Sequence, residues 1–227
     1  MRLTLLPLIA LLLVNPAHAE VVTKSDTGFV VRSSGLTGKT PREAWTVLVT
    51  PSGWWDKAHT WSGDSANLTL DPKAGACFCE VLPLPKDAPA SARHGSVEHM
   101  RVIFADPGKV LRMSGGLGPL QSEALAATLT ITLKPVEGGT RILWEYVAAG
   151  YMRYKPEEIA PAVDGMIAEQ VTRLIARIDA GPAVAAPVAR RAPVRAAAPT
   201  AAKPTDEASP AAAPVPRPAP KRPARKP

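Results

Sequence analysis

The sequence contains few aromatic residues and very few cysteines. Trp, Tyr and Phe make up 5% of its 227 residues, and Cys77 and Cys79 are its only cysteines. Because no C-x-x-C pair is present, thioredoxin-like redox chemistry is not indicated. The sequence also lacks a Ser-His-Asp arrangement, a phosphate loop, an H-E-x-x-H pair and a dinucleotide-binding fingerprint. No common catalytic motif therefore identifies an activity.

Apolar runs long enough to span a membrane are also missing. The uncharged stretch from Leu3 to Val14 falls short of the roughly 20 residues that a membrane helix needs. It follows Arg2 and precedes Ala17 and Ala19, which form an A-x-A cleavage pattern. We therefore predict a signal peptide over residues 1–19, no transmembrane segment after its cleavage, and a periplasmic or secreted protein.

The positive charge of the chain is concentrated at its C-terminal end. Residues 181–227 contain 12 prolines, 16 alanines and no aromatic residue, a composition typical of an extended, disordered tail. Nine Lys or Arg against Asp206 and Glu207 give this tail a charge of +7, which equals the formal charge of the whole chain. Residues 20–180 carry 17 basic and 18 acidic residues, so nucleic acid is not expected as a ligand of the domain. Anionic envelope surfaces are a candidate partner for the tail.

A single domain is expected over residues 20–180. A first strand is predicted near residues 27–36, and Thr40, Pro41 and Glu43 form a capping-box signature for a helix. About six strands separated by turn residues follow, and residues 156–179 show the apolar spacing of a long amphipathic helix. This order predicts an α+β fold in which a curved antiparallel sheet of about seven strands wraps around the C-terminal helix, with short helices after the first strand.

Three of the five tryptophans lie within "GWWDKAHTWSGD", residues 53–64. Gly and Asp residues interrupt any helical or strand period there, so no single amphipathic face explains the indoles. Two interpretations remain open for Trp54, Trp55 and Trp61. They either plug one end of a hydrophobic core or line the mouth of a binding cavity.

The order of elements resembles that of the SRPBCC superfamily, the START-like, helix-grip fold of polyketide cyclase-like proteins. The resemblance covers residues 27–179 and is carried by three stretches. These are "PREAWTVLVTPSGWWDKAHTWSGDSANLTLDPKAGACFCE", "ADPGKVLRMSGGLGPLQ" and "PAVDGMIAEQVTRLIARID". The resemblance implies a deep, largely apolar cavity between the sheet and the C-terminal helix that binds hydrophobic small molecules. It places the tryptophan-rich segment near one end of that cavity.

Cys77 and Cys79 are two residues apart in "ACFCE", so on a strand both thiols point to the same face. Three interpretations follow: two small core residues, a redox-labile pair, or ligands of a zinc or copper ion. A metal would need further ligands such as His59, His94 or His99. No cofactor is predicted from this spacing.

Strand alternation places Val97, His99 and Arg101 on one face and Glu98, Met100 and Val102 on the other, while Glu145 lies opposite Trp144 and Tyr146. An ionisable group inside the cavity would be a candidate general base. His59, His99 and Glu145 are the catalytic candidates. The ligand-binding candidates are Trp54, Trp55, His59, Trp61, Cys77, Cys79 and His99.

The leading prediction is an exported protein that holds a hydrophobic small molecule in a cavity. The first alternative is a cyclase- or hydrolase-type enzyme that uses a cavity His or Glu. The second is an envelope interaction protein that acts through its basic tail.

Overall fold

The computed structural model describes residues 18–181 of the chain. The predicted signal peptide over residues 1–19 lies outside this range except for His18 and Ala19, which begin the first strand. The predicted tail over residues 181–227 lies outside it except for Gly181. Within the described range, no helix is both long enough and apolar enough to cross a membrane.

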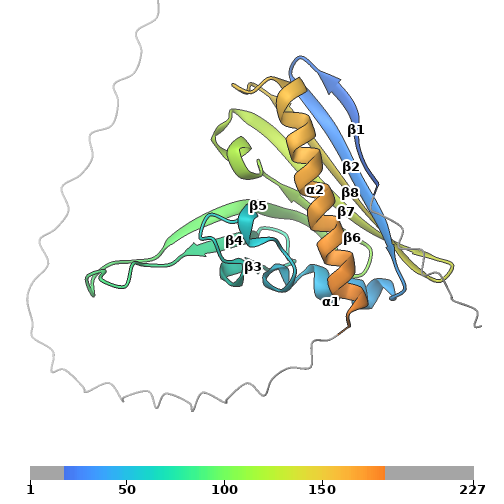
Figure 1. The fold of residues 1–227 in the computed structure, drawn as a ribbon, viewed down its shortest axis with the longest axis horizontal. Helices are drawn as coiled ribbons and strands as arrows, with labels where there is room; N and C mark the ends of the chain where they lie inside the picture. Colours follow the sequence, from blue (N-terminus) through green and yellow to red (C-terminus); the bar gives the residue numbers. More distant parts are fainter. Residues whose placement is uncertain (1–17, 182–227) are drawn as a thin grey trace, which may run out of the picture. The chain divides into compact units, whose positions relative to one another are not determined.

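The domain consists of one open, curved sheet and two helices, as the predicted α+β fold class requires (Figure 1). The sheet has eight strands in the order β1-β2-β8-β7-β6-β5-β4-β3, and all neighbouring strands are antiparallel. The strands are β1 (His18–Ser25), β2 (Gly28–Thr37), β3 (Leu68–Leu70), β4 (Cys77–Leu82), β5 (Gly95–Asp106), β6 (Val110–Ser114), β7 (Leu125–Val136) and β8 (Gly139–Gly150). The sheet has one strand more than the predicted seven. The additional strand is β1, whose first two residues belong to the predicted signal peptide.

The helix α1 (Pro41–Leu48) begins at the predicted capping box. The Thr40 side chain accepts a hydrogen bond from the Glu43 backbone N–H, and the Glu43 carboxylate accepts one from the Thr40 N–H at 2.9 Å. Both bonds satisfy N–H groups that a helix start leaves without intrahelical partners. Three short 3-10 turns follow α1 and carry the tryptophan-rich segment: η1 (Pro51–Gly53), η2 (Lys57–His59) and η3 (Ser65–Asn67).

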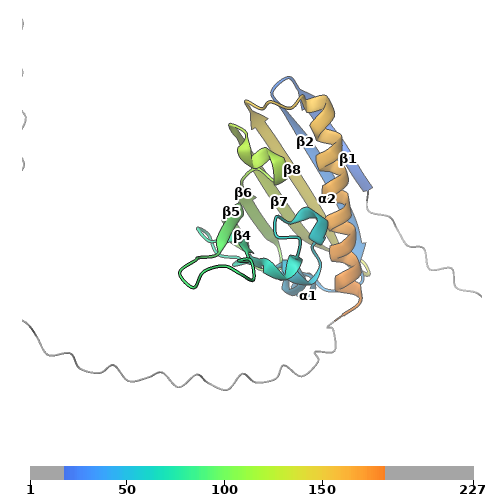
Figure 2. The ribbon, with the colours of Figure 1, turned by 60° about the vertical axis from the view of Figure 1, so that its left-hand side comes forward.

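The long helix α2 (Pro156–Asp179) lies across one half of the sheet, over β1 and β2 (Figure 2). Its buried side chains follow the predicted helical spacing: Val163, Ile167, Val171, Leu174 and Ile178. The other half of the sheet is covered by α1, the three 3-10 turns, and the turn η4 (Gly118–Ser122) after β6. We call the covered side of the sheet its inner face; it carries the buried residues Phe78, Leu129 and Trp144.

A β-bulge corrects the predicted alternation in β5. Phe78 pairs with Met100 and Cys79 pairs with Glu98, so His99 is an extra residue between two regular pairs. Consequently His99 and Met100 are both buried, although consecutive residues of a regular strand would point to opposite faces. The prediction that they lie on opposite faces is wrong for this physical reason.

Candidate functional site

The interior between the sheet and the tryptophan-rich segment is filled by aromatic rings. Trp55 lies 5.1 Å from Phe78 and 6.4 Å from Trp144, and Trp54 lies 6.0 Å from Trp144, measured between ring centroids. We call Trp54, Trp55, Phe78 and Trp144 the aromatic core. Only about 10 Å³ of open space remains among these rings and their aliphatic neighbours. The deep cavity that the family resemblance implied at this position is therefore filled.

The two adjacent tryptophans are held by hydrogen bonds as well as by packing. Trp54 Nε1 donates to the Val47 carbonyl at 3.0 Å, and Trp55 Nε1 donates to the His59 carbonyl at 3.1 Å. A buried indole N–H without a partner would cost free energy, so these bonds allow full burial. Trp54 thus belongs to the core and does not line the cavity described next.

A cavity of about 370 Å³ lies beside the aromatic core, between the first half of α2, η2 and the η4 turn. Its wall contains no Lys, Arg, Asp or Glu. The lining residues are Trp55, Ala58, His59, Thr60, Trp61, His99, Leu117, Gly118, Pro119, Ile159, Ala162, Val163 and Met166. Trp61, with 58% of its surface exposed, is the most exposed of the three clustered tryptophans. The structure therefore brings together four predicted ligand-binding residues: Trp55, His59, Trp61 and His99.

The η4 side of the cavity is fixed to the sheet by a buried tyrosine. Tyr146 on β8 accepts a hydrogen bond from the Leu117 N–H at 3.1 Å. Burial raises the pKa of Tyr146 to about 12, so the hydroxyl stays protonated. A Cβ at Gly116 would lie 2.5 Å from the Leu120 carbonyl oxygen, so the tight turn before η4 requires a glycine there.

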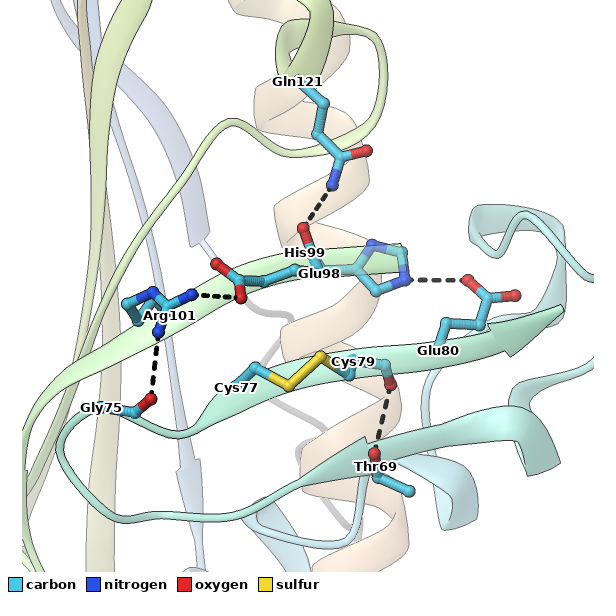
Figure 3. Close-up of a disulfide and its surroundings, with 9 residues drawn as sticks. All are labelled: Thr69, Gly75, Cys77, Cys79, Glu80, Glu98, His99, Arg101 and Gln121. Carbon is cyan, nitrogen blue, oxygen red and sulfur yellow. Dashed lines mark hydrogen bonds and ion pairs between the residues drawn. A yellow bond between two sulfur atoms is a disulfide. The ribbon is translucent and has the colours of Figure 1, made fainter. Parts of the chain in front are cut away.

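Glu80 and His99 form a buried pair (Figure 3), and His99 of this pair lines the cavity. Glu80 Oε2 lies 2.8 Å from His99 Nε2, and their side chains are 0% and 5% exposed. Glu80 also accepts hydrogen bonds from the Trp61 N–H at 3.0 Å and the Ser62 N–H at 2.5 Å. One carboxylate therefore positions both the imidazole and the backbone that carries Trp61.

The environment of this pair favours an ionised Glu80 and a neutral His99. Burial raises the pKa of Glu80, but hydrogen bonds from Ser62, Trp61 and His99 together lower it by more than burial raises it. The resulting pKa lies below the usual carboxyl value. Burial lowers the pKa of His99 more than Glu80 raises it. In this pair, the Glu80 carboxylate therefore accepts a hydrogen bond from the Nε2–H of an uncharged His99 ring.

His59 lies at the outer part of the cavity wall and contacts α2. Its Nδ1 lies 3.0 Å from Gln170 Nε2 and 3.9 Å from Glu169 Oε2. Ligand atoms of Asp56, His59 and Glu169 lie within 4.8 Å of one another, so these three residues have the spacing of a metal site. However, Arg173 Nη1 already lies 3.3 Å from Asp56 Oδ2 and supplies positive charge there. A hydrogen bond to Asp56 raises the pKa of Glu169, which favours its protonated form.

Cys77 and Cys79 are joined by a disulfide on the outer face of β4 (Figure 3). They alternate with the inward-facing Phe78 and Glu80, and both are half-buried. In this state neither residue is a core thiol or a thiolate ligand, so those two interpretations are wrong. The pairing agrees with the third interpretation, while its redox lability stays a prediction. Neither cysteine lines the cavity.

Glu145 also lies outside the cavity. On β8 it alternates with the buried Trp144 and Tyr146, and it forms an ion pair with Arg32 of the neighbouring strand β2 at 2.5 Å. Its carboxylate therefore serves the outer face of the sheet, and it is not a candidate base for chemistry in the cavity.

Glu80 and Gln170 position the two lining histidines, and neither was among the site residues predicted from the sequence. Glu80 had a usable signal, since it shares strand parity with the apolar Phe78 and not with the cysteines. Gln170 had a weaker one, because it lies next to Val171 on the apolar face of α2.

Comparisons with known proteins cover family models, curated proteins and solved structures. No family model matches the chain, and no curated protein matches it. Among solved structures, a protein from Rhodobacter sphaeroides has 21% identity and a TM-score of 0.46, covering 72% of this chain and 99% of its own. An uncharacterized protein from Rhizobium leguminosarum has 12% identity and a TM-score of 0.49, covering 73% and 99%. CalU16 from Micromonospora echinospora has 12% identity and a TM-score of 0.45, covering 74% and 86%.

Proposed function

We propose that the chain is an exported binding protein of the SRPBCC type that holds a hydrophobic small molecule in the cavity beside the aromatic core. The observation that carries this proposal is the cavity wall, which combines apolar side chains with two imidazoles and no charged residue. Its volume of about 370 Å³ is within the range of roughly 300–1,000 Å³ that is usual for small-molecule sites.

The distribution of buried and exposed side chains supports this choice. Trp61, Ile159 and Met166 remain partly open at the cavity while the neighbouring aromatic core is closed. Exposed apolar side chains around a hollow are typical of ligand sites, because a bound guest removes them from water. Export rests on the predicted signal peptide, and contact with an anionic envelope surface rests on the basic tail.

The test is binding of the neutral fluorescent probe N-phenyl-1-naphthylamine, which brightens in apolar surroundings. We expect saturable binding to the chain and strong weakening by Ala162→Trp, because Ala162 lines the cavity and an indole would occupy it. Ala176→Trp is the matched control, since Ala176 is also an exposed alanine of α2 but lies outside the cavity lining. A chain ending at Gly181 should bind the probe unchanged. Equal binding by both tryptophan variants would contradict the proposal.

An enzyme of the cyclase or hydrolase type is the second candidate, and the Glu80–His99 pair favours it. A carboxylate that holds one ring nitrogen of a neutral histidine leaves the other nitrogen available as a general base. On this alternative, His99→Phe abolishes turnover of a substrate while retaining its binding. If the chain only binds its ligand, the ligand is recovered chemically unchanged after incubation.

A further inference from the structure

The two ring nitrogens of His99 have different surroundings. Nε2 lies 2.8 Å from Glu80 Oε2, and this is the one hydrogen bond of the His99 ring among residues 18–181, so Nδ1 makes none there. Figure 3 shows this second nitrogen on the part of the ring away from the hydrogen bond to Glu80. Because His99 lines the cavity, Nδ1 is the ring nitrogen that remains for a guest.

Glu80 determines which nitrogen of His99 carries the proton. Its carboxylate accepts hydrogen bonds from two backbone N–H groups, of Trp61 and Ser62, and an ionised carboxylate can only accept. The bond to His99 therefore requires a proton on Nε2. In the neutral ring Nδ1 is then left with a lone pair and acts as an acceptor.

The second lining imidazole, His59, also carries its proton on Nε2 when neutral. Its protein partner, however, contacts Nδ1, whereas the partner of His99 contacts Nε2. Gln170 Oε1 accepts a hydrogen bond from the Asp56 N–H at 3.0 Å, so its amide nitrogen is the atom that faces His59 Nδ1 at 3.0 Å. His59 Nδ1 is thus an acceptor that is already occupied, and neutral His59 carries its proton on Nε2. The protein satisfies Nδ1 of His59 internally, but it leaves Nδ1 of His99 without a donor.

We propose that the cavity selects neutral ligands that carry a hydroxyl group, which donates its hydrogen bond to Nδ1 of His99, with Glu80 as the positioning residue. This inference rests on the proposed binding function and names the ligand class. A carboxylate or phosphate group would bring negative charge to an acceptor nitrogen in a wall without Lys or Arg. An ether or ester of the same shape would offer no proton to that nitrogen.

The test compares three naphthalene probes of nearly equal shape: 2-naphthol, 2-methoxynaphthalene and 2-naphthoate. We expect the chain to bind 2-naphthol about tenfold more tightly than 2-methoxynaphthalene, the usual effect of one hydrogen bond, and 2-naphthoate more weakly than either. His99→Phe should bind the first two equally. Equal binding of these two by the unaltered chain would overturn the inference while leaving the proposed function intact. Absence of binding by all three would overturn the proposed function itself.

A spectroscopic measurement covers the case in which His99→Phe does not fold. In the ¹⁵N spectrum of the unaltered chain, the shifts of His99 should report a proton on Nε2 and a bare Nδ1, and 2-naphthol should shift Nδ1. Glu80→Gln should change this pattern and reduce the preference for 2-naphthol. The matched control is Glu98→Gln. Glu98 lies next to His99 on β5, but its carboxylate forms an exposed ion pair with Arg101 and does not contact the His99 ring. A Glu80→Gln chain that keeps both the pattern and the preference would contradict the role of Glu80.

Discussion

The aromatic core and the neighbouring cavity both contain tryptophans of the segment over residues 53–64, yet the core is closed and the cavity is open. In the aromatic core, Trp54 and Trp55 each donate their indole N–H to a backbone carbonyl and pack against Trp144. At the cavity, the hydrogen bond that Trp61 makes within the described residues comes from its backbone N–H to Glu80, and 58% of the residue surface remains exposed. Trp144 is buried in the same core although its Nε1 has no hydrogen-bond partner among the described residues, so ring packing is what closes this interior, while Trp61 lacks such packing and remains at the cavity wall.

The largest expected effect separates the two regions by stability. Trp54→Ala should lower the free energy of unfolding by about 3–5 kcal/mol, because it leaves a large hole in a packed core. Trp61→Ala should change it by less than about 1 kcal/mol, since most of the ring is already exposed, but should weaken probe binding. Urea unfolding and fluorescence titration measure the two quantities. Equal destabilisation by both variants would remove the distinction between the regions.

A smaller effect concerns the turn that closes one side of the cavity. Tyr146→Phe removes the acceptor of the buried Leu117 N–H and should cost about 1–3 kcal/mol, because that donor would then be unsatisfied. Hydrogen exchange measured by mass spectrometry should speed up over residues 115–122. Thr128→Ser, on the neighbouring strand β7, controls for a general effect of substitution in this sheet. If exchange over residues 115–122 is unchanged in Tyr146→Phe, the turn is held by other contacts.

The smallest expected effect is a change in the pH dependence of stability. His99 has a lowered pKa in the folded chain, so below about pH 6.5 the unfolded chain binds a proton that the folded chain resists. The free energy of unfolding should therefore decrease as the pH falls through this range, and His99→Gln should flatten the decrease. His94→Gln, in an exposed loop, is the control. An identical slope in His99→Gln and the unaltered chain would contradict a neutral, buried His99.

Patterns with a local physical cause were predictable from the sequence. The capping box at Thr40 and Glu43 depends on four consecutive residues, and the placement of Glu145 opposite Trp144 and Tyr146 depends on strict alternation; the structure confirms both. The helix over residues 156–179 was equally visible in its apolar spacing.

The features that failed depend on contacts between distant segments. The bulge at His99 arises from the pairing of β4 with β5, and no residue type near position 99 indicates a bulge. The closed state of the aromatic core depends on Trp144 meeting Trp54 and Trp55 across about 90 residues of chain. The candidate site was therefore predictable only in part. The sequence supplied Trp55, His59, Trp61 and His99, but Glu80 and Gln170 became visible only in the structure.

The most direct test of the account is a titration with 2-naphthol followed by the indole N–H signals of the five tryptophans. The account predicts that the signals of Trp61 and Trp55 shift, because both rings line the cavity, while those of Trp54 and Trp144 stay in place within the aromatic core. Shifts confined to Trp54 and Trp144, or no shift at any tryptophan, would contradict the claim that the ligand site lies beside a closed core.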